Sequence, residues 1–260
     1  MPARLAAHLL PRVVLPGRDQ MELDRALLDW AAASPERLVV RVYGWARPTL
    51  SLGRAEPYPE GWDEAALAVE GIDVVRRPTG GDAVLHDDEA TFAVAGSVPG
   101  PWSRGPRAFA LAVADAVAAA LRSLDVPASV VSRGTEALPP GRPGDRPCFA
   151  RTAAGEVRVL GRKAAGIASR FAAGGALSHG SVPLSARHRD VARFRVGRVE
   201  EEALLRGHTL SVGEALGRAV PRGEVEARLV GAIEDRFGVI LSRREFADLG
   251  LAAVTRAPLC

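Results

Sequence analysis

The sequence has few cysteines and no long apolar run. Only two of its 260 residues are cysteine, Cys148 and Cys260, which is too few for a disulfide framework and is typical of a reducing compartment. No stretch approaches the roughly 20 apolar residues that cross a bilayer, and residues 1–15 lack the continuous apolar segment of a secretion signal. These absences exclude a small disulfide-rich fold and a membrane-spanning one, and we expect a cytoplasmic protein with no membrane partner.

Lysine is almost absent. The chain has 34 lysine and arginine residues together, and Lys163 is the only lysine among them. At exposed positions either side chain serves as a solubilising charge, so a preference for arginine costs little there. A site that needs a slim ammonium on a flexible stem cannot accept the planar guanidinium in its place. The retention of Lys163 therefore predicts that it has a function.

The remaining composition is that of a globular protein. With 47% hydrophobic and 25% charged residues, the chain is able to bury a substantial core. The formal charge of +3 is spread along the chain and forms no basic arm with interleaved aromatics, so nucleic acid is not an expected partner. No spacing of histidine, cysteine and carboxylate residues indicates a metal site.

Apolar periodicity predicts a mixture of helices and strands. Apolar residues at helical spacing predict helices over 19–33, 62–70, 107–124, 223–237 and 244–254. Runs rich in β-branched residues, or bounded by glycine, predict strands over 38–43, 73–76, 149–151, 156–160, 163–171 and 174–184, with another strand ending at Leu52. Neighbouring strands joined by short turns favour an α/β or α+β fold with a mixed, largely antiparallel sheet flanked by helices.

The domain organisation follows from the same pattern. No shift in composition or long linker divides the chain, so we expect one domain over 1–260. Its core would cover about 19–195, and a helical C-terminal part would cover about 199–256. The segment 133–147 is rich in proline and glycine and is predicted to be irregular.

A glycine-rich loop follows the strand predicted over 73–76. It reads Arg76-Arg77-Pro78-Thr79-Gly80-Gly81-Asp82-Ala83-Val84-Leu85-His86-Asp87. Paired glycines let the backbone approach a ligand closely, and arginine offers a fork for phosphate or carboxylate. The loop alone indicates either a ligand site or a tight turn flanked by exposed arginines.

Several separated motifs together resemble the biotin/lipoate protein ligase superfamily, and its lipoate branch in particular. The glycine-rich loop, followed by Glu89-Ala90-Thr91, resembles the signature of that superfamily. The other matching segments are Met21 to Leu28, Arg41 to Trp45, Gly161-Arg162-Lys163-Ala164-Ala165-Gly166 and Ser178-His179-Gly180-Ser181. Their order is the expected one, and they cover most of residues 20–185. The resemblance implies a single catalytic domain of this superfamily.

Cys148 distinguishes between two activities within this superfamily. Members with a cysteine ahead of the lysine motif resemble octanoyltransferases, whereas lipoate-protein ligases activate a free acid with ATP and need no cysteine. If 149–152 and 156–160 form a hairpin, Cys148 pairs with Leu160 and lies within about 10 Å of Lys163. A neighbouring cation would stabilise the thiolate.

The resemblance implies a two-step acyl transfer that needs no cofactor. Cys148 takes octanoyl from octanoyl-acyl-carrier protein, and a lysine of a lipoyl domain or glycine-cleavage H protein then takes it from the enzyme. Lys163 would hold the acyl carbonyl and stabilise the oxyanion. The expected substrate-binding residues are Arg76, Arg77, Thr79, Gly80, Gly81, His86, Ala165, Gly166, His179 and Gly180. We expect a monomer.

Individual residues allow other interpretations. His86 and Asp87 are expected to brace the loop by hydrogen bonds, and a single histidine on a strand such as His179 is often structural. The sequence departs from the family pattern at Asp82, at Asp88 and at 167–169. The added carboxylates would disfavour a polyphosphate, which favours a thioester donor over ATP.

Other activities remain open at this point. An ATP- and magnesium-dependent lipoate-protein ligase of the same fold is the nearest alternative. A non-catalytic module that binds lipoyl or acyl-carrier domains is another, although Cys148 and Lys163 argue against it. A biotin ligase fits less well, because the opening helix and the Cys148 segment resemble the lipoate branch.

Overall fold

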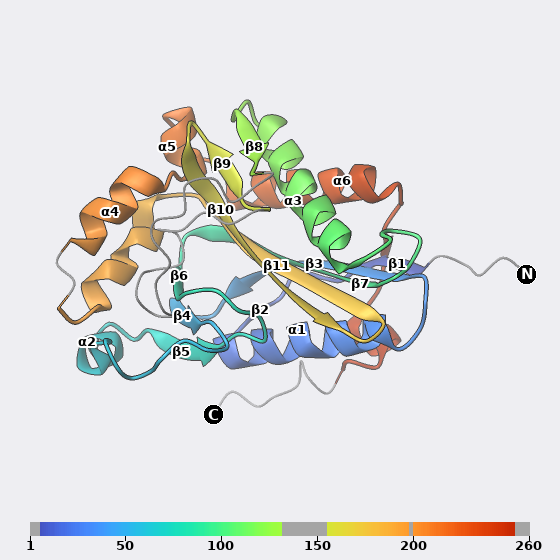
Figure 1. Ribbon diagram of the computed structural model, residues 1–260, viewed down its shortest axis with the longest axis horizontal. Coiled ribbons are helices and arrows are strands. Elements are labelled where there is room, and N and C mark those ends of the chain that lie inside the picture. The colour runs from blue at the N-terminus through green and yellow to red at the C-terminus, as the bar shows by residue number, and fades with distance from the viewer. Residues whose placement is uncertain (1–5, 132–154, 198–199, 253–260) are drawn as a thin grey trace, which may run out of the picture.

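A large mixed sheet forms the centre of the protein (Figure 1). The computed structural model describes residues 6–131, 155–197 and 200–252. The order of strands in the sheet is β12 (Ser242–Arg243), β1 (Ala6–Leu9), β3 (Arg37–Trp45), β7 (Glu89–Ser97), β11 (Gly175–Pro183), β10 (Arg162–Ala172), β9 (Val157–Val159) and β8 (Ala128–Val130), and β2 (Val14–Leu15) also pairs with β3. β1 and β2 run parallel to β3, and every pairing from β3 to β8 is antiparallel. This confirms the predicted mixed, largely antiparallel sheet.

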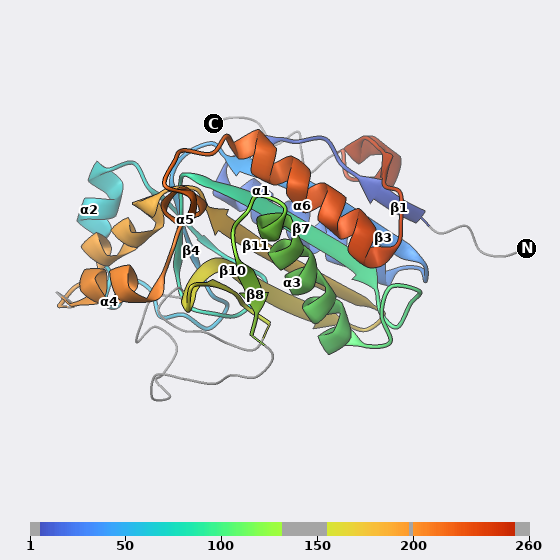
Figure 2. The same ribbon diagram turned by 90° about the horizontal axis from the view of Figure 1, so that it is seen from above.

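Helices cover both faces of this sheet. α3 (Pro106–Arg122) and α6 (Arg222–Phe237) pack side by side over one face, and α1 (Gly17–Ala32) lies along the other (Figures 1 and 2). α1 buries Met21, Leu27 and Leu28 against the sheet. Its buried face also carries the polar Asp24, which places a carboxylate inside the apolar layer.

The alternation of side chains along β3 separates two apolar layers. Leu38, Val40 and Val42 join the core under α3 and α6, while Val39 and Tyr43 join the core under α1. Because successive side chains of a strand point to opposite faces, Arg41 points to the same side as Val39 and Tyr43. The α1 side of the sheet therefore contains both apolar and charged groups.

A small second sheet lies at one end of the large one. It has the order β5 (Asp73–Arg76), β4 (Thr49–Leu52) and β6 (Val84–His86). Its apolar core includes residues of α2 (Glu64–Val69), η2 (Ala186–Phe194) and α4 (Glu201–His208). The loop between β5 and β6 carries the arginine and glycine motif, so this sheet positions the motif beside the large sheet.

Most of the predicted elements are present within one to three residues of their expected bounds. The helices expected over 19–33, 107–124 and 223–237 are α1, α3 and α6. The helix expected over 62–70 is the shorter α2. The strand expected over 149–151 lies outside the described residues, as does the irregular segment 133–147.

One prediction is wrong. The described residues 244–252 form no long helix, because only Phe246–Leu249 makes a turn of 3₁₀ helix, η3, after the short strand β12. The apolar residues Phe246 and Leu251 pack under α1, which does not require a helix. The segment 149–152, predicted to form a hairpin with 156–160, lies outside the described residues, and β9 pairs with β8 and β10.

Candidate active site

An apolar pocket opens between α1, the large sheet and the small sheet. The empty space between its atoms is about 400 Å³ with open solvent at the mouth included, and about 40 Å³ of it admits the centre of a water-sized sphere. Its walls come from α1, β3, β6, β7, β10, β11 and the motif loop, through Met21, Tyr43, Trp45, Arg77, Val84, His86, Thr91, Gly166, Ile167, Ala168, His179, Gly180 and Ser181. Seven of these thirteen residues have a polar side-chain group, and all seven belong to the segments that resemble the superfamily motifs, but the surface that lines the pocket is mostly apolar.

One of the pocket histidines is held by a buried carboxylate. Nδ1 of His179 lies 2.6 Å from Oδ2 of Asp24, and Nε2 lies 2.7 Å from Oγ1 of Thr79. Asp24 also accepts hydrogen bonds from Nη2 and Nε of Arg41, at 2.5 and 3.1 Å. Because an ionised carboxylate only accepts, the proton of His179 is on Nδ1, and Nε2 accepts from the Thr79 hydroxyl when the ring is neutral.

The sheet register explains how these groups meet. Ala93 of β7 lies between Arg41 of β3 and His179 of β11, and its small side chain leaves room for Asp24 to reach both. Burial opposes the ionisation of Asp24, but the charge of Arg41 and the hydrogen bond from His179 outweigh it and lower the Asp24 pKa. Burial, followed by the charge of Asp24, raises the pKa of the neighbouring Tyr43 hydroxyl well above its ordinary value. Asp24 is therefore anionic and Tyr43 neutral near pH 7.

The motif loop is fastened to the small sheet by its two arginines. Nη1 of Arg77 donates to the carbonyl and hydroxyl oxygens of Ser51, and Nη2 donates to the carbonyls of Gly80 and Asp82. Arg76 points elsewhere and donates to backbone carbonyls of the segment 53–56. Arg77 also lines the pocket, whereas Arg76 ties the start of the motif loop to the segment 53–56.

The loop lies against the backbone at Gly53. A β-carbon added at Gly53 would lie 1.7 Å from the carbonyl oxygen of Gly81, so only glycine fits there. Gly81 has a φ of 92°, which favours glycine as well. Gly80 and Gly81 are exposed and are not part of the pocket wall.

His86 braces the second side of the pocket. Its Nε2 lies 2.6 Å from Oγ of Ser51 and its Nδ1 lies 2.6 Å from Oε1 of Glu89. The ring stacks on Trp45 with a centroid distance of 4.2 Å and an angle of 19° between the planes. The expected bracing by His86 is confirmed, and its ring also lines the pocket.

Lys163 is buried beside a carboxylate. Its Nζ lies 2.5 Å from Oε1 of Glu156, and only 1% of the lysine is exposed. A bulge between Lys163 and Ala165 interrupts the pairing of β10 with β9 at this point. Neither Lys163 nor Ala165 lines the pocket described above, whereas Gly166, which follows Ala165, does.

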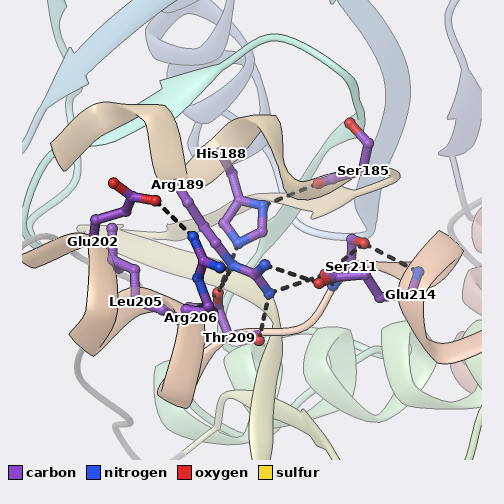
Figure 3. A network of polar contacts seen from close by, with 9 residues as sticks. All are labelled: Ser185, His188, Arg189, Glu202, Leu205, Arg206, Thr209, Ser211 and Glu214. Atoms are coloured by element: carbon purple, nitrogen blue, oxygen red, sulfur yellow. Dashed lines mark hydrogen bonds and ion pairs between the residues drawn. The ribbon is translucent and has the colours of Figure 1, made fainter. Parts of the chain in front are cut away.

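A polar network around Arg189 and Thr209, shown in Figure 3, adjoins the strand that carries Lys163. The amide of Leu210 donates to the carbonyl of Lys163. The preceding Thr209 bonds to His188 and Arg189 of η2, and Arg189 pairs with Glu214. Glu214 in turn caps α5 (Val212–Leu216) through Ser211. Burial lowers the pKa of His188 to about 4, so it is neutral near pH 7.

The pocket brings together part of the predicted site. Its wall includes the predicted residues Arg77, His86, Gly166, His179 and Gly180, and Thr79 bonds to His179. Lys163 and Ala165 lie in β10 away from this wall, and Cys148 lies outside the described residues. Asp24, Trp45, Ser51, Glu89 and Glu156 also belong to the site, although no role was predicted for them from the sequence. A charged residue on an apolar helix face or in a buried strand was the available signal for Asp24 and Glu89.

Across 6–131, 155–197 and 200–252, no three His, Cys, Asp or Glu side chains are grouped so as to hold a metal ion. None of the helices in these ranges has the length and apolar character needed to span a membrane.

Curated relatives of this chain are octanoyltransferases by name. It is 32% identical to the octanoyltransferase LipM of Moorella thermoacetica, over 89% of this chain and 84% of the relative. It is 31% identical to the octanoyltransferase LipM of an Exiguobacterium species, over 94% and 93%.

Solved structures of lipoate-protein ligases share the fold. A lipoate-protein ligase A bound with ATP superposes with a TM-score of 0.73 at 18% identity, over 96% of this chain and 95% of that one. A putative lipoate protein ligase of T. acidophilum with bound lipoic acid gives 0.73 at 17%, over 96% and 93%. The model of the lipoyl protein ligase A/B catalytic domain matches residues 16–234. The chain thus belongs to the family of lipoyl protein ligase A/B catalytic domains.

Proposed function

We propose that this protein is an octanoyltransferase of protein lipoylation. It moves an octanoyl group from octanoyl-acyl-carrier protein, through a thioester on Cys148, to a lysine of a lipoyl-carrier protein. The names of the relatives that match over most of both chains support the activity. The apolar pocket beside the arginine and glycine loop is the structural observation that carries the proposal.

The pocket suits an aliphatic chain. Ligand sites of this kind are mostly apolar, with a small number of polar groups that orient the ligand. Met21, Val84 and Ile167 offer aliphatic contacts, while Arg77 and the two histidines stand at the wall. Ser181 and Thr91 add hydroxyls. Arg77 is the one described lining side chain with a permanent positive charge. That balance favours an acyl group over a polyphosphate.

The reaction has two balanced steps. The thiolate of Cys148 attacks the thioester carbonyl, a new carbon–sulfur bond forms, and the carrier-protein thiolate leaves. The acceptor lysine then attacks the acyl-enzyme as a free amine, the carbon–nitrogen bond forms, and the Cys148 thiolate leaves while the amine proton passes to solvent. Two easier steps thereby replace one difficult transfer.

In this proposal Lys163 stabilises the oxyanion that develops in each step. This requires the reacting carbonyl to reach β10 beyond the pocket wall, because Lys163 is buried and does not line the pocket. An ammonium held in a place shielded from water is effective, because charge interactions are stronger there than in bulk solvent. Glu156 keeps this ammonium in the protein interior, at 2.5 Å from its Nζ. The hydrogen-bond network of Thr209, Arg189 and Glu214 supports β10, the strand that carries Lys163.

The acceptor is a lipoyl domain or a glycine-cleavage H protein. One solved neighbour is described as an archaeal bipartite lipoate protein ligase with its E2 lipoyl domain, and it shares the fold at 19% identity with a TM-score of 0.70. Family membership and the relatives' names support an acceptor of this class. The donor rests on Cys148 and on the chemistry of its thiolate.

Intact-mass analysis tests the proposal. The purified protein is incubated with octanoyl-acyl-carrier protein and a lipoyl domain, without ATP, and a parallel sample receives ATP, magnesium and free octanoate. We expect one octanoyl mass on the acceptor in the first sample. Modification only in the second sample would replace the proposal with an ATP-dependent ligase, and modification in neither would favour a binding module.

A further inference from the structure

Three side chains of the pocket wall share one buried acceptor. Oε1 of Glu89 lies 2.6 Å from Nδ1 of His86, 2.7 Å from Oγ1 of Thr91 and 3.1 Å from Nε1 of Trp45. These donors belong to β6, β7 and β3, and all three residues line the pocket, whereas Glu89 does not. Glu89 is only 3% exposed. It thus stands behind the wall and contacts three of its members.

The bonds around Glu89 leave the wall little freedom. The Thr91 hydroxyl donates to Glu89 and accepts a hydrogen bond of 3.0 Å from the Trp45 indole. The indole ring stacks face to face on the His86 ring, so each ring covers one face of the other and restricts its rotation. A rotation of Trp45 or His86 would break the bond to Glu89 and leave a buried carboxylate with fewer donors, which is costly.

The same network reaches the motif loop. With His86 neutral, Nδ1–H donates to Glu89 and Nε2 accepts from the Ser51 hydroxyl. The Ser51 oxygen accepts from Nη1 of Arg77 at 2.9 Å. The hydrogen bonds therefore all run in one direction: Arg77 donates to Ser51, Ser51 donates to His86, and His86 donates to Glu89. Glu89 thus links Arg77 of the motif loop to the stacked rings of Trp45 and His86.

Glu89 is anionic in this setting. Burial opposes its ionisation, but the neighbouring His86 and the donors Thr91 and Trp45 outweigh burial and lower the Glu89 pKa. An anion accepts stronger hydrogen bonds than a neutral group does. The fixed charge thus suits Glu89 to holding several donors at once.

We propose that Glu89 is a positioning residue for acyl binding, because it holds Trp45, His86 and Thr91 in the pocket wall and couples them to Arg77. This role rests on the proposed function, in which the pocket receives the octanoyl chain. Glu89 does not touch the acyl group. It acts through side chains that do.

Glu89→Gln tests this role. The amide is nearly isosteric and keeps one acceptor oxygen, but it loses the charge, and its NH2 group is buried where Oε2 has no hydrogen-bond partner. By analogy with groups that orient metal ligands, we expect about a tenfold rise in the KM for octanoyl-acyl-carrier protein and in the Kd for free octanoate measured by calorimetry. The kcat should change less than about threefold, because no group that reacts with the thioester is altered.

Glu226→Gln is the matched control. Glu226 is also a buried carboxylate, 7% exposed, and accepts two hydrogen bonds of 3.1 Å from Nε of Arg12, but it lies on α6 away from the pocket. Its replacement should lower the melting temperature while the KM and the octanoate affinity stay at parental values. If Glu89→Gln fails to fold, Thr91→Val removes one donor of the network and should raise the same KM and Kd.

The outcomes separate this role from the proposed function. Parental transfer activity with an unchanged KM and Kd in Glu89→Gln overturns the positioning role and leaves the transferase standing. A parent that binds octanoate without transferring it, and loses that affinity in Glu89→Gln, supports the role and overturns the transferase. A parent that does neither overturns both.

Discussion

Nδ1 of His179 lies 2.6 Å from Oδ2 of Asp24, although 155 positions separate them in the sequence. The helix α1 brings Asp24 to the sheet, and β11 brings His179 to the same face. Arg41 completes the group from β3. The family motifs that look independent in the sequence therefore form one buried polar cluster at the pocket.

Replacing Asp24 should destabilise the protein strongly. Asp24→Asn leaves the guanidinium of Arg41 buried without its anion, and such a loss costs about 3–5 kcal/mol. Asp115→Asn is the control, because Asp115 forms an exposed pair with Arg236 at 3.2 Å and should cost less than about 1 kcal/mol. Urea unfolding measures both. Equal, small losses would show that Asp24 contributes no more than a surface charge.

The thiol of Cys148 should carry the acyl group. Incubation with octanoyl-acyl-carrier protein should add one octanoyl mass that is lost with hydroxylamine and is absent in Cys148→Ala. Cys260→Ser is the control and should match the parent in mass spectra. An adduct mapped to Cys260, or acceptor modification by Cys148→Ala at the parental rate, would remove the thioester mechanism.

Lys163 should not be replaceable by arginine. Lys163→Arg keeps the charge, but the planar fork does not fit the enclosed site beside Glu156, so the kcat should fall by about 100-fold, as for the loss of an oxyanion donor. The reciprocal change at the neighbouring position, Arg162→Lys, should leave turnover close to that of the parent. Near-normal turnover by Lys163→Arg would show that the single lysine has no special role.

Glu56 should give the stability a measurable dependence on pH. Burial, followed by the charge of Asp82, raises the pKa of Glu56 from 4.5 to about 7. The folded protein therefore keeps a proton that the unfolded chain releases, and the free energy of unfolding falls as the pH rises from about 4.5 to 7. In Glu56→Gln this contribution is absent.

The comparison between Glu56→Gln and the parent isolates this group. The unfolding free energy of the variant minus that of the parent should grow between pH 5 and pH 7.5, by on the order of 1 to 2 kcal/mol after allowance for screening. His188, with its lowered pKa of about 4, has the opposite trend, because stability is lost as the pH falls from its ordinary 6.5. That trend is common to both proteins and cancels. A pH-independent difference would contradict the raised pKa.

Local patterns in the sequence determined much of the fold. Apolar spacing in α1 and α3 and the β-branched residues of β3 predict these elements because the period of side-chain burial is a local property. Apolar spacing also predicts a helix over 244–254 that is not observed in the described residues, because Phe246 and Leu251 are apolar where they pack under α1 and do not share a helix face. The pairing of β9 with β8 and β10 was not predicted, since strand pairing depends on which other strands compete for an edge.

The sequence by itself determined which motifs are present, and the order of those motifs indicated the family. Only the tertiary structure decided which residues meet. Asp24 and Glu89 are ordinary acidic residues in the sequence, and they become supports of the pocket because β3, β7 and β11 align in one register under α1. Lys163 stands out in the sequence, yet the position of its charge depends on a bulge in β10 and on the ion pair of Lys163 with Glu156. Side-chain chemistry is encoded locally, whereas burial and proximity are set by long-range packing.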